Sequence, residues 1–139
     1  MPINIELVQR KISLILEDLD QLRQLAALTL EDYLADQRNE VLAERYLERI
    51  IGRVIDINFH IITEESLITP KDYSESFIRL SGIEILDRSK AEHLARLAGL
   101  RNLLAHEYNG IDAGLIHQSI QELVTELPEY LKAIQKSLS

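Results

Sequence analysis

The sequence predicts an all-α protein, an antiparallel helical bundle of about five helices that forms one domain over residues 1–139. Apolar residues recur at steps of three and four along most of the chain, and residues that cap helices precede several of these stretches. No convincing strand pattern, repeat or linker interrupts them. The hydrophobic content of 46% over 139 residues is enough for a real core, so a bundle with short connections follows.

The first half of the chain predicts two long helices joined by a short one. Asn4 caps a first helix, and Thr29 with Asp32 is typical of the start of a short helical turn. A second long helix is expected from about Asn39 to Glu65. Its stretch from residue 50 to 62 is apolar on more than one face, which indicates burial on several sides, in the core or at a subunit contact. We therefore expect a homodimer.

The second half predicts three further helices. Thr69-Pro70 is a capping residue followed by proline, which predicts the start of the third helix, and Gly82 predicts its end. The fourth helix is expected to begin with a capping box at Ser89–Glu92 and to break at Asn109-Gly110. Asp112 can cap the last helix.

Composition narrows the function classes. The chain has no cysteine, which excludes disulfides and thiolate metal sites. Its net charge of −8 argues against broad non-specific binding to nucleic acid, but it does not exclude a small basic pocket on an acidic body. The N-terminus does not resemble a signal peptide and no segment is apolar for long enough to span a membrane. We therefore expect a cytoplasmic protein that does not associate with membranes.

Most standard chemistry has no counterpart in the sequence. The glycines form no phosphate-binding loop and the four histidines lack metal-ligand spacing, so we expect neither a metal nor a cofactor. Asp56 and His60 share one helix face and are interpreted as a structural polar pair. Arg45, Arg49 and Arg53 are interpreted as a solvated, salt-bridged face, although such a row could also steer phosphates.

The stretch RNLLAHEY, residues 101–108, gathers four functional side chains near the end of the fourth predicted helix. At about 100° per residue, Arg101 and Tyr108 are nearly eclipsed. Asn102 and His106 share a neighbouring stripe, so Asn102 could orient the His106 ring. One helix end therefore offers a permanent cation, an imidazole, an amide and a phenol. On these physical grounds alone, capping, salt bridging and packing explain the four residues as well as a functional site does.

The spacing R-x4-H-x-Y, formed by Arg101, His106 and Tyr108 with Asn102 also matching, resembles the signature of the HEPN superfamily. The tyrosine points to its HepT-like branch, which the stretch IGRVIDINFHIITEE on the second long helix also resembles. The resemblance implies a compact HEPN-like helical bundle, usually a dimer with two copies of the motif facing one cleft. It also implies a metal-independent endoribonuclease.

By this resemblance we expect the toxin of a toxin–antitoxin pair, with RNA as its substrate. His106 would act as general base or general acid, and Arg101 would hold the scissile phosphate. Asn102 would support these two catalytic residues. The expected partner is a MntA-type nucleotidyltransferase antitoxin that transfers AMP onto Tyr108 and so silences the nuclease.

Two alternatives from other classes stay open. One is a non-catalytic HEPN module that binds a nucleotide or docks a nucleotidyltransferase, and the other is a helical adaptor without an active pocket. A neighbouring nucleotidyltransferase gene would favour the toxin and the module over the adaptor. Toxicity that is lost on changing His106 would separate the toxin from the module.

Overall fold

The computed structural model describes residues 2–107 and 109–139, and within these ranges it contains six α-helices and no strand. The helices are α1 (Ile5–Ala26), α2 (Leu30–Leu34), α3 (Gln37–Ser66), α4 (Tyr73–Gly82), α5 (Arg88–His106) and α6 (Ala113–Ser137). The predicted all-α bundle is confirmed, and the short turn expected after Thr29 forms α2 as a sixth helix. No helix of the described residues has the length and apolar character that crossing a membrane requires.

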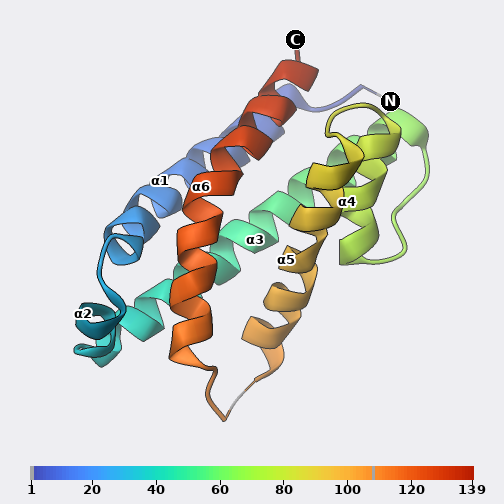
Figure 1. Cartoon of the computed structure of the whole chain (residues 1–139). Coiled ribbons are helices and arrows are strands. Elements are labelled where there is room, and N and C mark those ends of the chain that lie inside the picture. The colour runs from blue at the N-terminus through green and yellow to red at the C-terminus, as the bar shows by residue number, and fades with distance from the viewer. Residues whose placement is uncertain (1, 108) are drawn as a thin grey trace.

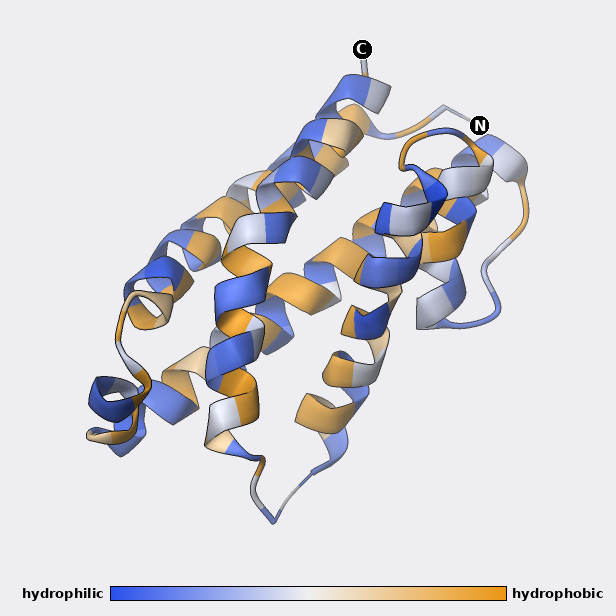
Figure 2. Cartoon of the chain, viewed as in Figure 1, coloured by the Kyte–Doolittle hydropathy of each residue, from blue (hydrophilic) through white to orange (hydrophobic). Residues whose placement is uncertain are grey.

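α3 is the central helix of the bundle. Figure 1 shows α1 and α6 side by side along one flank of α3, with α4 and α5 paired on the other, and all of these helices contact α3. Their apolar faces turn inward and their polar faces turn outward, as the hydropathy colouring of Figure 2 shows. This arrangement is what a set of amphipathic helices must adopt in order to remove its apolar stripes from water.

The apolar excess in the middle of α3 is buried inside this one chain. Seven aliphatic residues of this stretch are at most 4% exposed: Ile50, Ile51, Val54, Ile55, Ile57, Ile61 and Ile62. The neighbouring helices of the same chain cover α3 on several sides, so its apolar faces need no second subunit. Of the two alternatives predicted for this stretch, burial in the core is the one observed, and the homodimer stays a prediction that rests on the resemblance alone.

Three of the predicted caps are confirmed, because side chains accept hydrogen bonds from the first backbone N–H groups of α1, α2 and α6 at Asn4, Thr29 and Asp112. Two others were wrong. Asp72 caps α4 in place of Thr69, and Asp87 caps α5 in place of Ser89. Both aspartates lie close to the predicted caps in the sequence, and a carboxylate at the cap also interacts favourably with the helix dipole.

Two polar clusters fix the helices relative to α3. The Asp18 carboxylate on α1 is almost fully buried. Its Oδ2 forms ion pairs with two arginines of α3, at 3.0 Å from the Arg49 Nε and 2.8 Å from the Arg53 Nη1. The predicted arginine face is thus salt-bridged. Arg49 and Arg53 are directed at α1, whereas Arg45 stays exposed and pairs with Glu48 on α3 itself at 3.6 Å. Asp56 and His60 do not pair with each other: Asp56 pairs with Lys11 at 3.3 Å, and the His60 Nε2 accepts a hydrogen bond from the Asn4 N–H at 2.9 Å.

The second cluster runs through the core to the start of α4. The hydroxyl of Tyr130 on α6 donates to the Asn58 Oδ1 on α3 at 2.5 Å. The Asn58 amide donates to the Ser76 hydroxyl at 3.3 Å, and that hydroxyl donates to the backbone carbonyl of Tyr73 at 2.6 Å. Burial raises the pKa of Tyr130 well above its ordinary value, so the phenol stays a donor. This chain of hydrogen bonds holds Tyr73 in place beside α5.

Candidate active site at the end of α5

Arg101, Asn102 and His106 lie on the last turns of α5, as predicted from the sequence. The helix ends at His106, because Glu107 has an extended backbone while its N–H still donates to the Leu103 carbonyl at 3.0 Å. The chain therefore leaves the helix three residues before the predicted break at Asn109-Gly110. Tyr108 lies outside the described residues.

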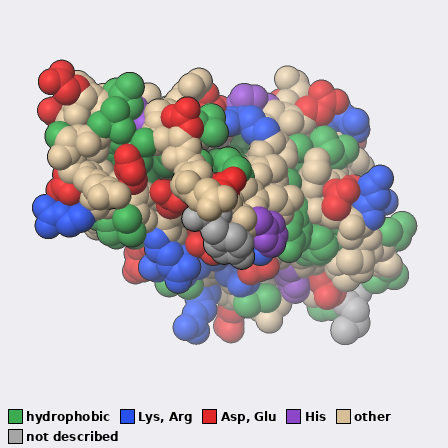
Figure 3. Space-filling model, turned by 90° about the horizontal axis from the view of Figure 1, so that it is seen from below, with side chains coloured by type: hydrophobic (Ala, Val, Ile, Leu, Met, Phe, Trp, Pro, Cys, Tyr) green, Lys and Arg blue, Asp and Glu red, His purple; other side chains and the backbone are tan. Residues whose placement is uncertain are grey.

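The last turns of α5 are much less covered than its first turns. Its fully buried residues all precede position 99: they are Ala91, Leu94, Leu97 and Ala98. Beyond them, Asn102 and His106 are exposed, and Arg101 is half-buried. Figure 3 views this end of the bundle, where histidine and basic side chains lie among acidic ones. The end of α5 thus presents polar groups to the outside of the chain.

Arg101 is held by an aromatic ring. Its guanidinium carbon lies 5.0 Å from the centroid of the Tyr73 ring, which is a cation–π distance. The Tyr73 ring in turn meets the Phe59 ring edge to face, with 6.2 Å between the centroids. Among the described residues Arg101 has no ion-pair partner, although it belongs to a chain of net charge −8. An aromatic face orients a guanidinium while leaving its N–H donors available for an anion.

Asn102 and His106 make no side-chain hydrogen bond with any other described residue. The contact by which Asn102 could orient the His106 ring is therefore not formed within this part of the chain. Asn102 instead lines a hollow of about 540 Å³ between the middle of α5 and the start of α4. Lys71, Tyr73 and Ser74 form the other side of this hollow, and the small residue Gly99 lies beside Asn102.

Sequence reasoning missed the contribution of α4 to this region. Tyr73 supports Arg101 and also lines the hollow, yet the two residues belong to different helices. Periodicity and capping signals describe one helix at a time, so neither could reveal this pairing. An aromatic residue at the start of a helix beside an exposed lysine was the only available signal, and it is too common to be informative.

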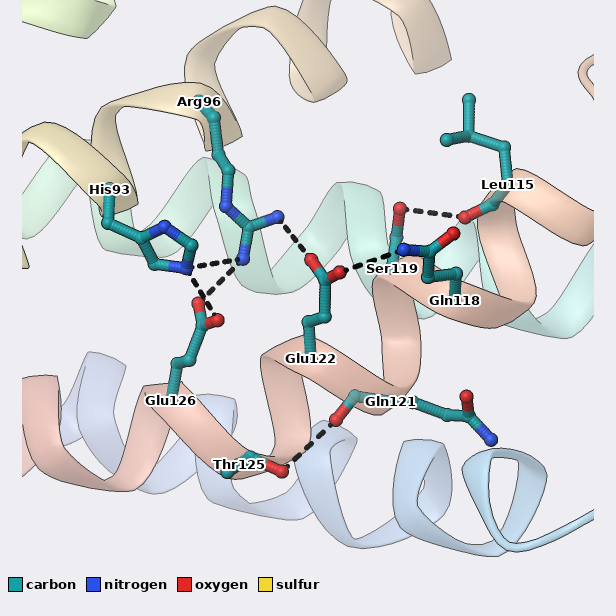
Figure 4. A network of polar contacts seen from close by, with 9 residues as sticks. All are labelled: His93, Arg96, Leu115, Gln118, Ser119, Gln121, Glu122, Thr125 and Glu126. Carbon is teal, nitrogen blue, oxygen red and sulfur yellow. Dashed lines mark hydrogen bonds and ion pairs between the residues drawn. The ribbon is translucent and has the colours of Figure 1, made fainter.

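A separate polar network ties α5 to α6 one to two turns before the motif. Arg96 pairs with Glu122 and with Glu126, both at 2.7 Å, and the His93 ring lies 2.6 Å from Glu126 (Figure 4). Because these charges satisfy one another, the network is best explained as an anchor for α5. No cluster of His, Cys, Asp and Glu among residues 2–107 and 109–139 has a metal-binding arrangement.

Comparisons with known proteins assign the chain to a family. A family described as ribonuclease HepT-like matches residues 15–134. The tRNA nuclease HepT of Aphanizomenon flos-aquae is 34% identical over an alignment that covers 97% of this chain and 93% of that protein. The mRNA nuclease HepT of Shewanella oneidensis is 24% identical, with 64% of this chain and 67% of that protein covered.

A solved structure shares the fold. The tri-AMPylated HEPN toxin of Shewanella oneidensis, solved in complex with an MNT antitoxin, superposes with a TM-score of 0.83 over 94% of this chain and 97% of that chain. Its sequence is 20% identical, so this likeness concerns the helical arrangement. The family match spans residues 15–134, most of the chain. The chain therefore belongs to the ribonuclease HepT-like family.

Proposed function

We propose that this chain is the toxin of a toxin–antitoxin pair and an endoribonuclease that cleaves RNA without a metal ion. One observation carries the proposal: Arg101 and His106 present a cation and an imidazole at the uncovered end of α5, where neither has an ion-pair or hydrogen-bond partner among the described residues. Membership of the ribonuclease HepT-like family, and a tRNA nuclease and an mRNA nuclease among its relatives, support the reaction class.

In the proposed reaction, His106 accepts the proton of a ribose 2′-hydroxyl, for which an imidazole is suited near neutral pH. The 2′-oxygen forms a bond to phosphorus while the bond from phosphorus to the 5′-oxygen breaks. A histidine then returns a proton to the leaving 5′-oxygen. Arg101 binds the phosphate through its planar N–H donors and stabilises the charge that develops on it. The products are a 2′,3′-cyclic phosphate and a 5′-hydroxyl.

We infer that the active form is a homodimer of a single domain, residues 1–139, acting in the cytoplasm. A two-fold axis at the ends of the α5 helices would bring two copies of Arg101 and His106 into one cleft. The second imidazole could then supply the proton that the leaving oxygen needs. Two copies of Arg101 would also concentrate positive charge in the cleft of an otherwise acidic protein, and the phosphates of an RNA substrate require such a charge. Asn102 would support the pair from the same helix face.

The proposed partner is a MntA-like nucleotidyltransferase antitoxin that attaches AMP to Tyr108. The S. oneidensis toxin described above is tri-AMPylated and was solved with its MNT antitoxin, which supports a partner of this kind. In this sequence Tyr108 follows His106 by two residues, so an attached phosphodiester would add negative charge beside the motif. Arg101 could pair with that phosphate, and the RNA would be excluded by charge and by bulk.

Cleavage of single-stranded RNA by the purified chain in EDTA tests the nuclease directly. Wild type should cleave in chelator and leave 2′,3′-cyclic phosphate ends, which mass spectrometry of the products can identify. His93→Ala is a matched control, because it removes another exposed histidine of α5 outside the motif, and it should keep cleavage. Cleavage that stops in EDTA would overturn the metal-free mechanism, and binding without cleavage would favour the non-catalytic module.

The modification is tested by co-expression with a MntA-like nucleotidyltransferase encoded beside the gene. Wild type should gain the mass of one or more AMP groups and lose nuclease activity, whereas Tyr108→Phe should gain none and stay active. Tyr46→Phe, a change on α3, is the control and should be modified like wild type. An adduct that persists in Tyr108→Phe would place the modification elsewhere.

A further inference from the structure

The hollow between α4 and α5 combines an aromatic ring, a cation and an amide next to Arg101. Its volume of about 540 Å³ lies in the range of about 300–1,000 Å³ that is usual for ligand sites. Tyr73 contributes its ring, Lys71 its ammonium group and Asn102 its amide. Opposite Tyr73 the wall consists of Ala95, Ala98 and Gly99, which leave space above the helix backbone.

The charges at the hollow favour an anionic ligand. Lys71 is exposed and, like Arg101, has no ion-pair partner among the described residues. Asp72 is the one carboxylate that lines the hollow, and its Oδ1 is occupied by the Glu75 N–H at 2.7 Å, because Asp72 caps α4. Lys71 is thus the charged group of the hollow that has no partner among the described residues, and Arg101, at the Tyr73 ring, adds a second such cation beside it.

Tyr73 connects the hollow to the motif. Its ring lies beside the Arg101 guanidinium, and its backbone carbonyl is held by Ser76 within the buried hydrogen-bond chain from Tyr130. A ring fixed in this way can form the wall against which a flat group packs. A phosphate bound by Arg101 would lie next to this wall, so the neighbouring part of the same ligand would reach the hollow.

We infer that this hollow is a nucleoside subsite, which binds the single-stranded RNA nucleotide adjacent to the phosphate held by Arg101. The inference rests on the proposed function and extends it to residues of α4. The base packs against Tyr73, Lys71 binds the next phosphate along the strand, and Asn102 meets the edge of the base. Aromatic packing and backbone cations are the two means by which proteins bind single strands without reading sequence. Asn102 adds a donor and an acceptor that can favour particular bases.

Equilibrium binding of RNA to a variant that cannot cleave it tests the nucleoside subsite independently of the nuclease activity. Fluorescein-labelled single-stranded RNA is titrated onto the full-length His106→Ala protein, in which cleavage is removed, and anisotropy is followed at several salt concentrations. Adding Tyr73→Leu should weaken binding about 5- to 100-fold, and Tyr73→Phe should restore it because the ring returns. Adding Lys71→Ala should weaken binding and reduce the slope of log Kd against log salt by about 0.7, as loss of one phosphate contact requires. Lys132→Ala, an exposed lysine of α6, is the control and should leave binding unchanged.

The outcomes distinguish the two proposals. If wild type cleaves RNA while Lys71→Ala and Tyr73→Leu bind as tightly as their parent, the subsite is overturned and the nuclease stands. If wild type does not cleave but both changes weaken RNA binding as expected, the hollow is supported and the nuclease is overturned. If Tyr73→Leu fails to fold, the Lys71→Ala variant alone tests the subsite. Lys71 is exposed, so its removal should not disturb folding, and a smaller slope of log Kd against log salt would report the loss of one phosphate contact.

Discussion

In the middle of α3, polar side chains find their partners inside the chain. Asn58 is fully buried between Tyr130 and Ser76, and Arg53 pairs with the buried carboxylate of Asp18. At the end of α5, the side chains of Arg101 and His106 have no hydrogen bond or ion pair to any described residue. The polar side chains of α3, like Arg96 and His93 in the earlier turns of α5, hold the bundle together, whereas those in the last turns of α5 do not. The contrast indicates that the polar groups at the end of α5 serve a ligand.

A large effect is expected from removing the guanidinium of Arg101 on α5. Arg101→Ala should lower kcat/KM for RNA cleavage by about 10²- to 10³-fold, the usual loss when a group that stabilises transition-state charge is removed. Arg101→Lys should recover only part of this, because an ammonium keeps the charge but lacks the planar fork. Steady-state cleavage is the measurement, with urea unfolding beside it. A variant that keeps its activity, or that loses stability as steeply as activity, would break the contrast with α3.

At the buried Asp18 carboxylate of α1, we expect a substitution to lower stability and to leave RNA cleavage unchanged. Asp18→Ala leaves Arg49 and Arg53 without their acceptor, so the free energy of unfolding should fall by about 1–3 kcal/mol, while cleavage per folded molecule stays the same. Asp56→Ala is the matched control, since Asp56 forms an exposed pair with Lys11 whose loss should cost at most about 1 kcal/mol. Urea titrations of the two variants give the comparison. Equal losses would show that burial of Asp18 is not what makes its ion pairs important.

Two buried tyrosines sharpen the contrast within the core. Tyr130→Phe should lower the free energy of unfolding by about 1–2 kcal/mol, because it leaves the buried Asn58 oxygen without its donor. The Tyr33 hydroxyl is buried but has no hydrogen-bond partner among the described residues. Tyr33→Phe should therefore be neutral or stabilising by up to about 1 kcal/mol. Thermal unfolding of both variants checks the prediction, and a loss at Tyr33 as large as that at Tyr130 would refute it.

A further expected effect concerns stability at alkaline pH. Burial, together with the nearby charges of Glu40 and Glu44, raises the pKa of Tyr33 to about 12 from 10.0. Above pH 10 the unfolded chain loses this proton while the folded chain keeps it, so ionisation favours the unfolded state and stability falls until the pH passes the folded pKa of about 12. Tyr33→Phe should flatten this part of the curve of stability against pH. Curves that stay parallel between pH 10 and 12 would contradict the assigned cause.

Local patterns in the sequence predicted much of this molecule. The steps of three and four between apolar residues predicted the long helices. Asn4, Thr29 and Asp112 predicted where helices begin, because a cap is a contact between near neighbours in the chain. The motif was placed near the end of a helix because both the apolar pattern of that helix and the break after it are local features of the sequence. Caps at Thr69 and Ser89 were wrong because aspartates two or three residues away compete for the same N–H groups.

What the sequence could not reveal depends on packing between distant segments. The apolar residues around Ile50 and Ile62 suggested a subunit contact, but several helices of the same chain cover them. Nothing local connects Tyr73 with Arg101, because their contact is made by the crossing of α4 and α5. The candidate site was therefore only half predicted: its residues on α5 were found, but Tyr73 at the start of α4 and Lys71 just before that helix were not.

His106→Ala, followed by cleavage and by urea unfolding on the same preparation, tests most directly whether the end of α5 serves a ligand and not the fold. His106 is exposed and ends its helix, so the free energy of unfolding should change by less than about 1 kcal/mol. Cleavage of RNA should fall by about 10²- to 10⁴-fold, as loss of a general acid or base requires. Full cleavage by this variant, or a loss of activity explained by unfolding, would contradict the assignment.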